Sequence, residues 1–389
     1  MITHPDRCGR RHIASATGFT LLEVLVTFFV LLILAGVALP VTRNTLRDQR
    51  NNRAAQIVTS FIDLTRNHAI AYERDMGVVF ERLEPEGFGR SACLRLRQVR
   101  GVPIYTGESA KAMATLVNVA GTVGGPINAA DFNPIESQLL ALSADMILAG
   151  NAADAPIRLG DRLELPGGRI VTILDIARVG TATVNELRTV RVTFNLREPS
   201  NLPAPLTSTY THPGRASRST NPPQRVRYAI HRAPVLTNTA SVSLPRGTAI
   251  DLNYSGFGVR GSEFMPNLND ASVVAGSVIV LFDSAGRVSR VNTGVGDVGP
   301  PVSQLFFCIG DLDGVQSAAA DLLNQERRSR ANVLRTSASW LVLNPATGRT
   351  FAAPLAPVGL TAMTGGIAEQ TTQAIEQARF LANLGDTLD

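Results

Sequence analysis

One stretch near the N-terminus restricts most strongly what this chain can fold into. Phe19 to Leu39 is a run of 21 residues that is apolar almost throughout, and Gly18 and Pro40 border it. A helix of that length rises about 31 Å at 1.5 Å per residue, which matches the hydrocarbon thickness of a bilayer. Its one charged side chain, Glu23, is costly at membrane depth, and this cost predicts a function for that position.

The rest of the chain has the composition of a globular protein. Charged residues make up 18% of the 389 residues, which excludes extended disorder. The formal net charge is +5, and the first 18 residues contribute +2 of it, three arginines against one aspartate. The remaining +3 is spread over 371 residues (389 − 18), and this balance argues against nucleic-acid binding.

The three cysteines, Cys8, Cys93 and Cys308, do not have the spacing of a zinc site. Cys93 and Cys308 both lie in strand-like runs. In an oxidising compartment they are expected either to form one long-range disulfide or to remain two buried thiols. The histidines are scattered without metal-ligand spacing, so we expect no metal and no cofactor.

Two ordinary interpretations of the apolar stretch are incomplete. A cleavable secretory signal has an apolar region of about 7–15 residues followed by a small-residue cleavage site, and this stretch is longer. A plain single-pass anchor fits the length but leaves Glu23 unexplained. The positive-inside rule does not fix the orientation, because arginines lie on both sides of the stretch.

The run Gly18–Glu23, GFTLLE, resembles the class III signal of type IV prepilins and of type II secretion pseudopilins. The resemblance implies that prepilin peptidase cuts between Gly18 and Phe19 on the cytoplasmic side, and that Phe19 is then methylated as the new N-terminal residue. Glu23 becomes the fifth residue of the mature chain (23 − 18) and Pro40 the twenty-second (40 − 18). At these positions the family keeps its carboxylate and, often, a helix-kinking proline.

The chemistry of these residues agrees with the resemblance. In a helix bundle of low dielectric constant, Glu23 is expected to pair with the new α-amine of a neighbouring subunit, which makes it an assembly contact rather than a catalytic group. Pro40 lacks an N–H and is expected to kink the helix, a change that costs about 3 kcal/mol in a helix interior. Its alternative role is to end the membrane span.

After Pro40 the helix is expected to continue to about Tyr72, because apolar residues recur at steps of three and four. Strand signals with glycine-containing turns follow. The predicted fold class is α+β, with a long N-terminal helix, membrane-spanning in its first half, packed on an antiparallel β-sheet or sandwich. The expected segments are a cleaved leader (1–18), the long helix (19–72, transmembrane half 19–39), a periplasmic β-rich domain (73–360) and a C-terminal helix and tail (361–389).

Several later segments are similar to the GspH/FimT-type minor pseudopilins: Leu64–Glu81, Leu244–Ser255, Val278–Arg290 and Trp340–Arg349. Residues 106–225 have no counterpart in a compact minor pseudopilin and are interpreted as an insertion. Within it, residues 108–116 and 133–147 are predicted to be helical. Val226–Ile230 is expected to resume the main sheet, and a further helix is predicted at Ser317–Arg330.

Two short patterns resemble ligand sites but lack the required surroundings. Gly256–Gly261 matches G-x-G-x-x-G, yet the residues that follow do not open a helix whose N-terminus could hold a pyrophosphate. Asp311–Gly314 is acidic, but its glycine comes fourth instead of sixth, so it is interpreted as an acidic turn, with calcium binding as the alternative.

Taken together, the resemblance implies a minor pseudopilin that assembles into a type II secretion pseudopilus. A position near the tip is expected, because the large domain would crowd a close-packed shaft. The implied partners are prepilin peptidase, other pseudopilin or pilin subunits, an inner-membrane assembly platform and membrane lipid. The expected location is the inner membrane, crossed once, with the C-terminal domain in the periplasm.

Two other classes stay open. A minor type IV pilin of a pilus or DNA-uptake system would bind DNA through exposed arginines in a strongly salt-dependent manner. A single-pass, membrane-anchored binding protein or enzyme predicts instead that substitutions of Gly18 and Glu23 leave function intact. The sequence holds no catalytic motif, so an enzyme is not expected.

Overall fold

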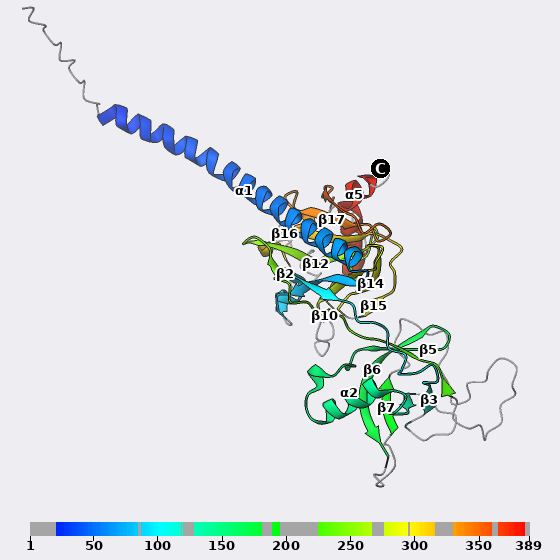
Figure 1. Cartoon of the computed structure of the whole chain (residues 1–389). Helices are drawn as coiled ribbons and strands as arrows, with labels where there is room; N and C mark the ends of the chain where they lie inside the picture. Colours follow the sequence, from blue (N-terminus) through cyan, green and yellow to red (C-terminus); the bar gives the residue numbers. More distant parts are fainter. Residues whose placement is uncertain are drawn as a thin grey trace, which may run out of the picture.

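The computed structural model describes residues 21–84, 87–117, 119, 128–180, 189–194, 225–266, 276–294, 296–315, 330–359 and 365–385. Within these residues the chain forms helices and antiparallel sheets, an α+β fold (Figure 1). Two bodies are visible. The main domain contains the long N-terminal helix and an 11-stranded sheet, and a second lobe contains a 7-stranded sheet.

Helix α1 (Leu21–Ala71) is one continuous helix of 51 residues, about 76 Å long at 1.5 Å per residue. Its C-terminal half lies across the main sheet, whereas its N-terminal half projects from the domain (Figure 1). The buried face of the C-terminal half follows the expected spacing, since Ala54, Val58, Ile62 and Ala69 are fully or almost fully buried. The helix ends where Glu73 takes a left-handed backbone conformation, φ 50°.

The main sheet is antiparallel throughout, and its strand order is β15-β14-β13-β1-β2-β12-β16-β17-β18. Two short strands also pair with β2: β10 (Val235–Leu236) and β11 (Val242–Ser243). The bounds of the others are β1 (Met76–Arg82), β2 (Ala92–Arg100), β12 (Thr248–Phe257), β13 (Val278–Phe282), β14 (Val288–Asn292), β15 (Asp297–Val298), β16 (Leu305–Asp311), β17 (Ser339–Leu343) and β18 (Thr350–Pro354).

Both faces of the main sheet are covered. On β16, Phe307 and Ile309 point into the core shared with α1, whereas Phe306 and Cys308 point into a core on the opposite face. That second core is closed by α4 (Ile367–Ala378) and α5 (Phe380–Gly385). Because both faces are buried, β16 is an unbroken run of buried residues rather than an alternating one.

Arg379 joins the C-terminal helices to the sheet. Its buried guanidinium donates to the backbone oxygen of Tyr254 at 2.7 Å and to that of Gly258. The guanidinium carbon lies 4.6 Å from the ring centre of Phe306 and 4.9 Å from that of Trp340. Burial lowers the pKa of Arg379 to about 9. The side chain therefore remains charged at neutral pH and is held by carbonyls and aromatic faces.

Two hairpin turns of the main sheet are held by one arginine of α1. Gly286, in the β13–β14 turn, and Gly348, in the β17–β18 turn, both have positive φ, 76° and 65°, so only glycine fits easily. Arg66 Nε donates to Gly286 O at 3.1 Å and to Thr347 O at 3.0 Å. The similar turn sequences at 283–287 and 344–349 therefore form one common contact with the helix.

The second lobe spans residues from Tyr105 to His231. Its sheet order is β8-β3-β4-β7-β6-β5-β9, and the edge strands β8 and β9 are separated in sequence only by Arg227 and Tyr228. The sheet therefore curls until one segment supplies both edges, which gives a small barrel with a packed apolar core. The elements are β3 (Ala114–Val117), β4 (Ala129–Phe132), α2 (Gln138–Leu148), β5 (Arg162–Leu165), β6 (Arg169–Val179), β7 (Thr189–Phe194), β8 (Arg225–Val226) and β9 (Ala229–His231).

Some predicted elements differ from the structure. Val226–Ile230 does not resume the main sheet, because β8 pairs with β3 and β9 with β5, and the chain returns to β2 only at Val235. Residues 108–116 are a turn followed by the start of β3 rather than a helix, because Ala114 pairs with Phe132. The helix predicted at 133–147 is present as α2, but it begins only at Gln138, because residues 133–137 form a turn. The helix expected at Ser317–Arg330 lies outside the described residues except for Arg330.

Four short 3-10 helices complete the described elements: η1 (Gly87–Ser91), η2 (Ala152–Asp154), η3 (Leu312–Gly314) and η5 (Asn332–Leu334). The last two lie on the side of the domain from which α1 projects, since Arg47 of α1 contacts Asp311 immediately before η3. They therefore border the junction described below.

Candidate functional site

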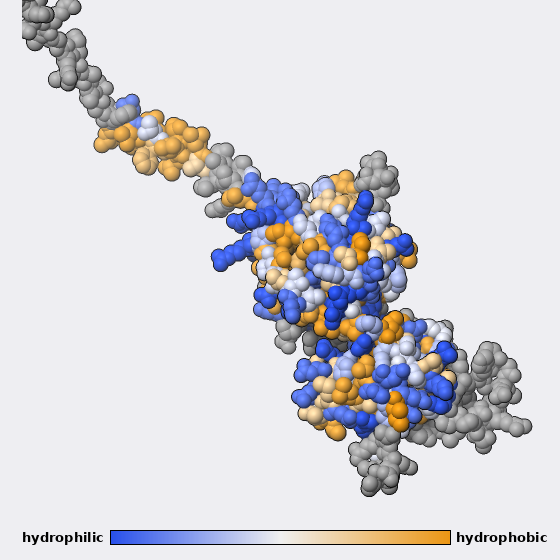
Figure 2. Space-filling model, viewed as in Figure 1, coloured by the Kyte–Doolittle hydropathy of each residue, from blue (hydrophilic) through white to orange (hydrophobic). Residues whose placement is uncertain are grey.

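The projecting half of α1 is the most unusual surface of the described chain. From Leu21 to Leu34 its large apolar side chains are exposed on all sides, with relative exposures from 46% at Val24 to 84% at Leu21. Figure 2 shows this segment as a continuous hydrophobic rod that extends away from the mixed surface of the domain. Contiguous apolar surface of this extent is typical of a segment that is covered by a partner or by lipid.

The sequence explains why this segment is helical although its large apolar side chains are exposed. Leucine is among the best helix formers, and the segment contains neither a glycine nor a proline between Leu21 and Leu34. Glu23 lies in the first turn, where the positive end of the helix dipole interacts favourably with a carboxylate. The helix is therefore rigid where it is exposed, which suits a contact surface.

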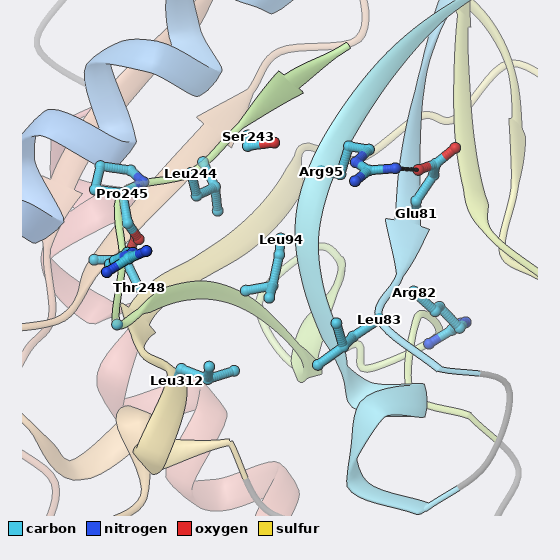
Figure 3. A pocket seen from close by; sticks show the side chains of 12 residues that line it. Glu81, Arg82, Leu83, Leu94, Arg95, Ser243, Leu244, Pro245, Thr248 and Leu312 are labelled. Carbon is cyan, nitrogen blue, oxygen red and sulfur yellow. Dashed lines mark hydrogen bonds and ion pairs between the residues drawn. The ribbon is translucent and has the colours of Figure 1, made fainter.

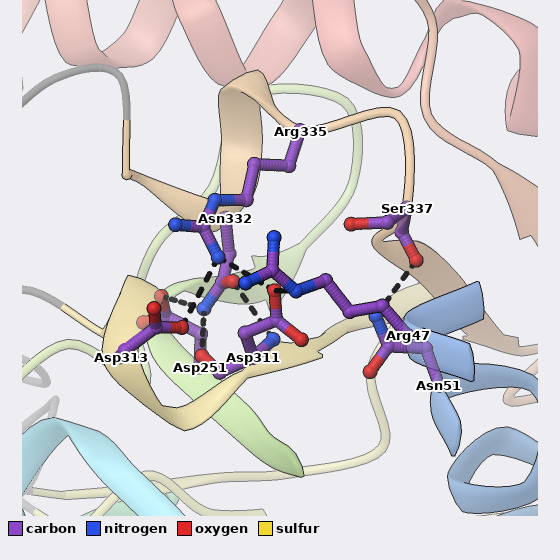
Figure 4. A network of polar contacts seen from close by, with 8 residues as sticks. All are labelled: Arg47, Asn51, Asp251, Asp311, Asp313, Asn332, Arg335 and Ser337. Atoms are coloured by element: carbon purple, nitrogen blue, oxygen red, sulfur yellow. Dashed lines mark hydrogen bonds and ion pairs between the residues drawn. The ribbon is translucent and has the colours of Figure 1, made fainter. Parts of the chain in front are cut away.

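A polar cluster fixes the direction in which this half leaves the domain (Figure 4). Arg47 Nε on α1 lies 3.2 Å from Asp311 Oδ2, at the end of β16. One turn further on, the Nδ2 of buried Asn51 donates to the backbone oxygen of Ser337 at 2.8 Å. Arg335 also binds Asp311, at 2.6 Å, so one carboxylate joins α1 to the loop after η5.

A buried carboxylate lies beneath this junction. Asp251 of β12 is fully buried and accepts from Asn332 Nδ2 at 3.0 Å and from Asn253 N at 3.1 Å. Asn332 in turn accepts from Asp311 N at 3.0 Å. Desolvation raises the pKa of Asp251 to about 7, although both hydrogen bonds act in the opposite direction. Its protonation therefore changes near neutral pH.

Residues 311–314 serve this junction. Asp311 and Asp313 both pair with Arg335, at 2.6 and 3.1 Å. Among the described residues, no group of three or more histidine, cysteine, aspartate or glutamate side chains is arranged to hold a metal ion. The carboxylates of this acidic turn therefore form ion pairs with arginine side chains.

Gly256–Gly261 forms the end of β12 and the turn after it. Glu263 Oε2 accepts from Phe257 N at 2.8 Å, so a carboxylate is turned into the space where a phosphate group would have to lie. The oxygen of Gly258 accepts from Arg379. Both interactions belong to the packing of the domain.

A surface pocket of about 440 Å³ lies between β1, β2 and the segment before β12 (Figure 3). Its wall combines leucines with charged groups, of which Glu81, Arg82 and Arg95 have partners. Glu81 lies 3.9 Å from Arg95, and Arg82 donates at 2.7 Å to the oxygen of Gly276. Among the described lining residues there is no histidine or cysteine to serve as a base or nucleophile.

The two cysteines of the domain are free and fully buried, so the expected alternative of a disulfide is wrong for this structure. Cys93 of β2 pairs with Ile250, and Cys308 of β16 pairs with Asp251, so β12 separates the two strands. Two strand spacings amount to about 9.5 Å, beyond the reach of a disulfide. The side chains also point into cores on opposite faces of the sheet.

The structure describes only two of the four processing and assembly residues that the sequence predicts. Glu23 lies on the exposed first turn of α1. Pro40 lies within α1, which is described as one helix through this position, and the kink expected there stays a prediction. Gly18 and Phe19 lie outside the described residues. Sequence reasoning did not identify the junction, because Arg47, Asp311 and Ser337 are far apart in the chain and carry no motif.

Among the described residues, none of the helices combines the length and the apolar character that crossing a membrane requires. Comparison of the chain with known proteins gives no match: no family model, no curated protein and no solved structure is significantly similar to it.

Proposed function

We propose that this chain is a prepilin-like filament subunit, a minor pseudopilin of a type II secretion pseudopilus. The observation that carries the proposal is the construction of α1. One rigid helix is anchored in a globular domain by its second half and presents an apolar surface on every side with its first half. Such a segment needs neighbours of its own kind, and a bundle of parallel helices provides them.

The sequence at the start of α1 supports the same proposal. GFTLLE at Gly18–Glu23 resembles a prepilin processing signal, and its glutamate lies in the first turn of the exposed helix. Before assembly, we propose that Phe19–Leu39 spans the inner membrane once and that the domain lies in the periplasm. Support for this finer claim comes from the 21-residue apolar run, which matches the hydrocarbon thickness of a bilayer.

A position at or near the outer end of the filament is part of the proposal. The second lobe adds a barrel to the main domain on the side away from the projecting helix (Figure 1). A close-packed shaft surrounds each subunit with neighbours and leaves little space for a lobe of this size. Subunits near the outer end have fewer neighbours.

The test is N-terminal sequencing and intact-mass measurement of the full chain extracted from membranes. We expect an N-methylated Phe19 terminus, and an unprocessed Met1 terminus would contradict the proposal. Substitution of Gly18 by Glu should block processing, whereas Thr17→Ala, next to it in the leader, should not.

A second test separates processing from assembly. Glu23→Gln keeps the size of the side chain and removes its charge, so the chain should be processed normally but recovered in filaments much less often. Asp48→Asn is the matched control, because it removes an exposed carboxylate of the same helix that lies outside the projecting apolar segment. If both variants assemble like the original chain, Glu23 is not an assembly contact.

A further inference from the structure

Two neighbouring pockets form a hollow at the base of the main domain, on the side from which α1 projects. One is the pocket of about 440 Å³ beside β1 and β2 (Figure 3), and the other, of about 500 Å³, lies against α1. Gly247 and Leu312 line both, so the two pockets adjoin. We call them together the arginine hollow, because five arginines line it: Arg47, Arg50, Arg82, Arg95 and Arg246.

The charges of the hollow favour an anion. Its lining contains five arginines and three carboxylates, a net charge of +2 (5 − 3). The two carboxylates of the acidic turn at 311–314 already pair with arginines, and Glu81 accepts from Arg97 at 3.1 Å. Arg50 and Arg246 are exposed and form no ion pair with any other residue that the structure describes. Their counter-charge can therefore come from outside the chain.

Arg246 is presented by an ordered loop. Residues 245–249 do not pair with β2, although the residues on both sides of them do. The loop is closed on itself, because Thr248 N and Thr248 Oγ1 both donate to Pro245 O, at 3.1 and 2.8 Å. A side chain that projects from an ordered backbone loses less conformational freedom when it binds a ligand.

The apolar part of the lining favours a lipid over a small soluble anion. Four leucines share the hollow with the arginines: Leu83, Leu94, Leu244 and Leu312 (Figure 3). A phospholipid carries glycerol and acyl carbons next to its phosphate, so it can cover leucines and meet arginines at the same time. Inorganic phosphate would leave the leucines in contact with water.

The sequence sets the height of the hollow above a membrane. Arg47 and Arg50 follow Leu39, the last residue of the apolar run, by eight and eleven residues, about 12 and 16 Å along the helix. The headgroup layer takes up about 7 Å of this distance. The remaining distance, about 5–9 Å, is within one Debye length, which is about 10 Å at 0.1 M salt. The arginines therefore lie close enough to attract anionic headgroups.

We propose that the arginine hollow binds the headgroup of an anionic phospholipid, with Arg50 and Arg246 as the cations that hold its phosphate. The inference rests on the proposed function, because it requires the apolar run to lie in the bilayer before assembly, and it adds a lipid class and a binding surface. Guanidinium groups suit this task, since they bind phosphate oxygens in bidentate pairs. The two arginines are exposed, so salt screens the contact and the domain can leave the membrane surface again.

The test is native mass spectrometry of the full chain in detergent, titrated with phosphatidylglycerol or with phosphatidylcholine. The apolar helix can bind both lipids, so the ratio of the two affinities isolates the effect of the headgroup. We expect phosphatidylglycerol to bind several-fold more tightly, and the double variant R50Q/R246Q to bind the two lipids equally. The control R227Q/R287Q removes two exposed arginines from the second lobe and from the β13–β14 turn, and it should keep the original ratio.

Photocrosslinking in native membranes tests the location. Ser243 is exposed and lines the hollow, so a photoreactive residue at this position should become attached to phospholipid on illumination. The same residue at Ser284, exposed in the β13–β14 turn, is the control and should give no lipid adduct. Equal adducts at both positions would contradict a site in the hollow.

The inference is overturned if R50Q/R246Q keeps the preference for phosphatidylglycerol. It is also overturned if glycerol phosphate at equal concentration displaces the lipid, which would assign the hollow to a soluble phosphate compound, or if a DNA duplex displaces it. A chain with a processed Phe19 terminus that binds both lipids equally overturns the inference and leaves the proposed function intact. An unprocessed Met1 terminus overturns the proposed function instead, and a phosphatidylglycerol preference that depends on Arg50 and Arg246 still supports the hollow in that chain.

Discussion

At the scale of single residues, the most informative group is Asp251. Its hydrogen-bond partners among the described residues are Asn332 and the backbone of Asn253, and the pKa of about 7 reflects its complete burial on β12. A carboxyl pKa that is higher in the folded than in the unfolded state stabilises the fold at low pH. The stabilisation is lost as pH rises through the folded value.

This gives a prediction for pH dependence. Between pH 6 and 8, ionisation of Asp251 should lower the free energy of unfolding by about 1.4 kcal/mol, taking folded and unfolded pKa values of about 7 and 3.8. Denaturant titrations of the full chain in detergent at a series of pH values measure the effect. Asp251→Asn should remove the pH dependence in this range, even though it weakens the contact to Asn332. An equally steep profile in the variant would assign the titration to another group.

The cysteines show what residue patterns alone leave undecided. Both Cys93 and Cys308 lie in apolar strand-like sequences, and both are fully buried. Whether they meet depends on strand order and on the face to which each side chain points. Both depend on how β2 and β16 pair with β12, and the sequence around each cysteine does not show this pairing. Two free thiols and a disulfide were therefore equally compatible with the sequence.

At the scale of elements, the spacing of apolar residues predicted the long helix and several strands of the main sheet. Tyr72 was the expected end of the long helix, and α1 ends at Ala71, one residue earlier. Strand segments at Val278 and Trp340 are also present as β13 and β17. The pattern did not show that Val226–Ile230 belongs to the second lobe. The strands there, β8 and β9, have only two and three residues, which is too few to indicate which strand each one pairs with.

The contact of Arg66 with two turns leads to a prediction at this scale. Arg66→Ala removes the donor shared by Gly286 O and Thr347 O, and should lower the free energy of unfolding by about 2 kcal/mol. Asn67→Ala, at the next and exposed position, should have little effect. Hydrogen exchange at the two turns gives a local measurement. Faster exchange in both turns of the Arg66 variant is expected, and a change confined to one turn would argue against a shared clamp.

At the scale of the whole molecule, the second lobe is joined to the main domain by two neighbouring segments. Arg232 Nη2 donates to Pro103 O at 3.0 Å, and Tyr105 forms an isolated bridge with Ile230. The lobe has its own apolar core, separate from the two large cores of the main domain. Closure of its sheet by β8 and β9 was not predictable from the sequence, because it requires pairings between residues that lie more than 50 positions apart.

We therefore predict that the lobe can be removed. Replacing residues 105–230 by a short glycine-serine linker should leave a main domain that unfolds cooperatively, with a transition close to that of the full chain. Circular dichroism and thermal unfolding of the two proteins in detergent measure this. Loss of a cooperative transition would show that the lobe is part of the main folding unit. If the shortened chain folds, its incorporation into filaments shows whether the lobe is needed for assembly.

The attachment of α1 also has a mechanical meaning. Buried contacts hold the helix from Asn51 to Ala69, a length of about 27 Å, on a sheet that is covered on its other face. A force applied to the projecting end acts along the helix axis, so these contacts are loaded together in shear and are not peeled one by one. Arg47 and Asn51 add polar contacts at the near end of this attachment. The domain is thus built to remain attached when its helix is pulled.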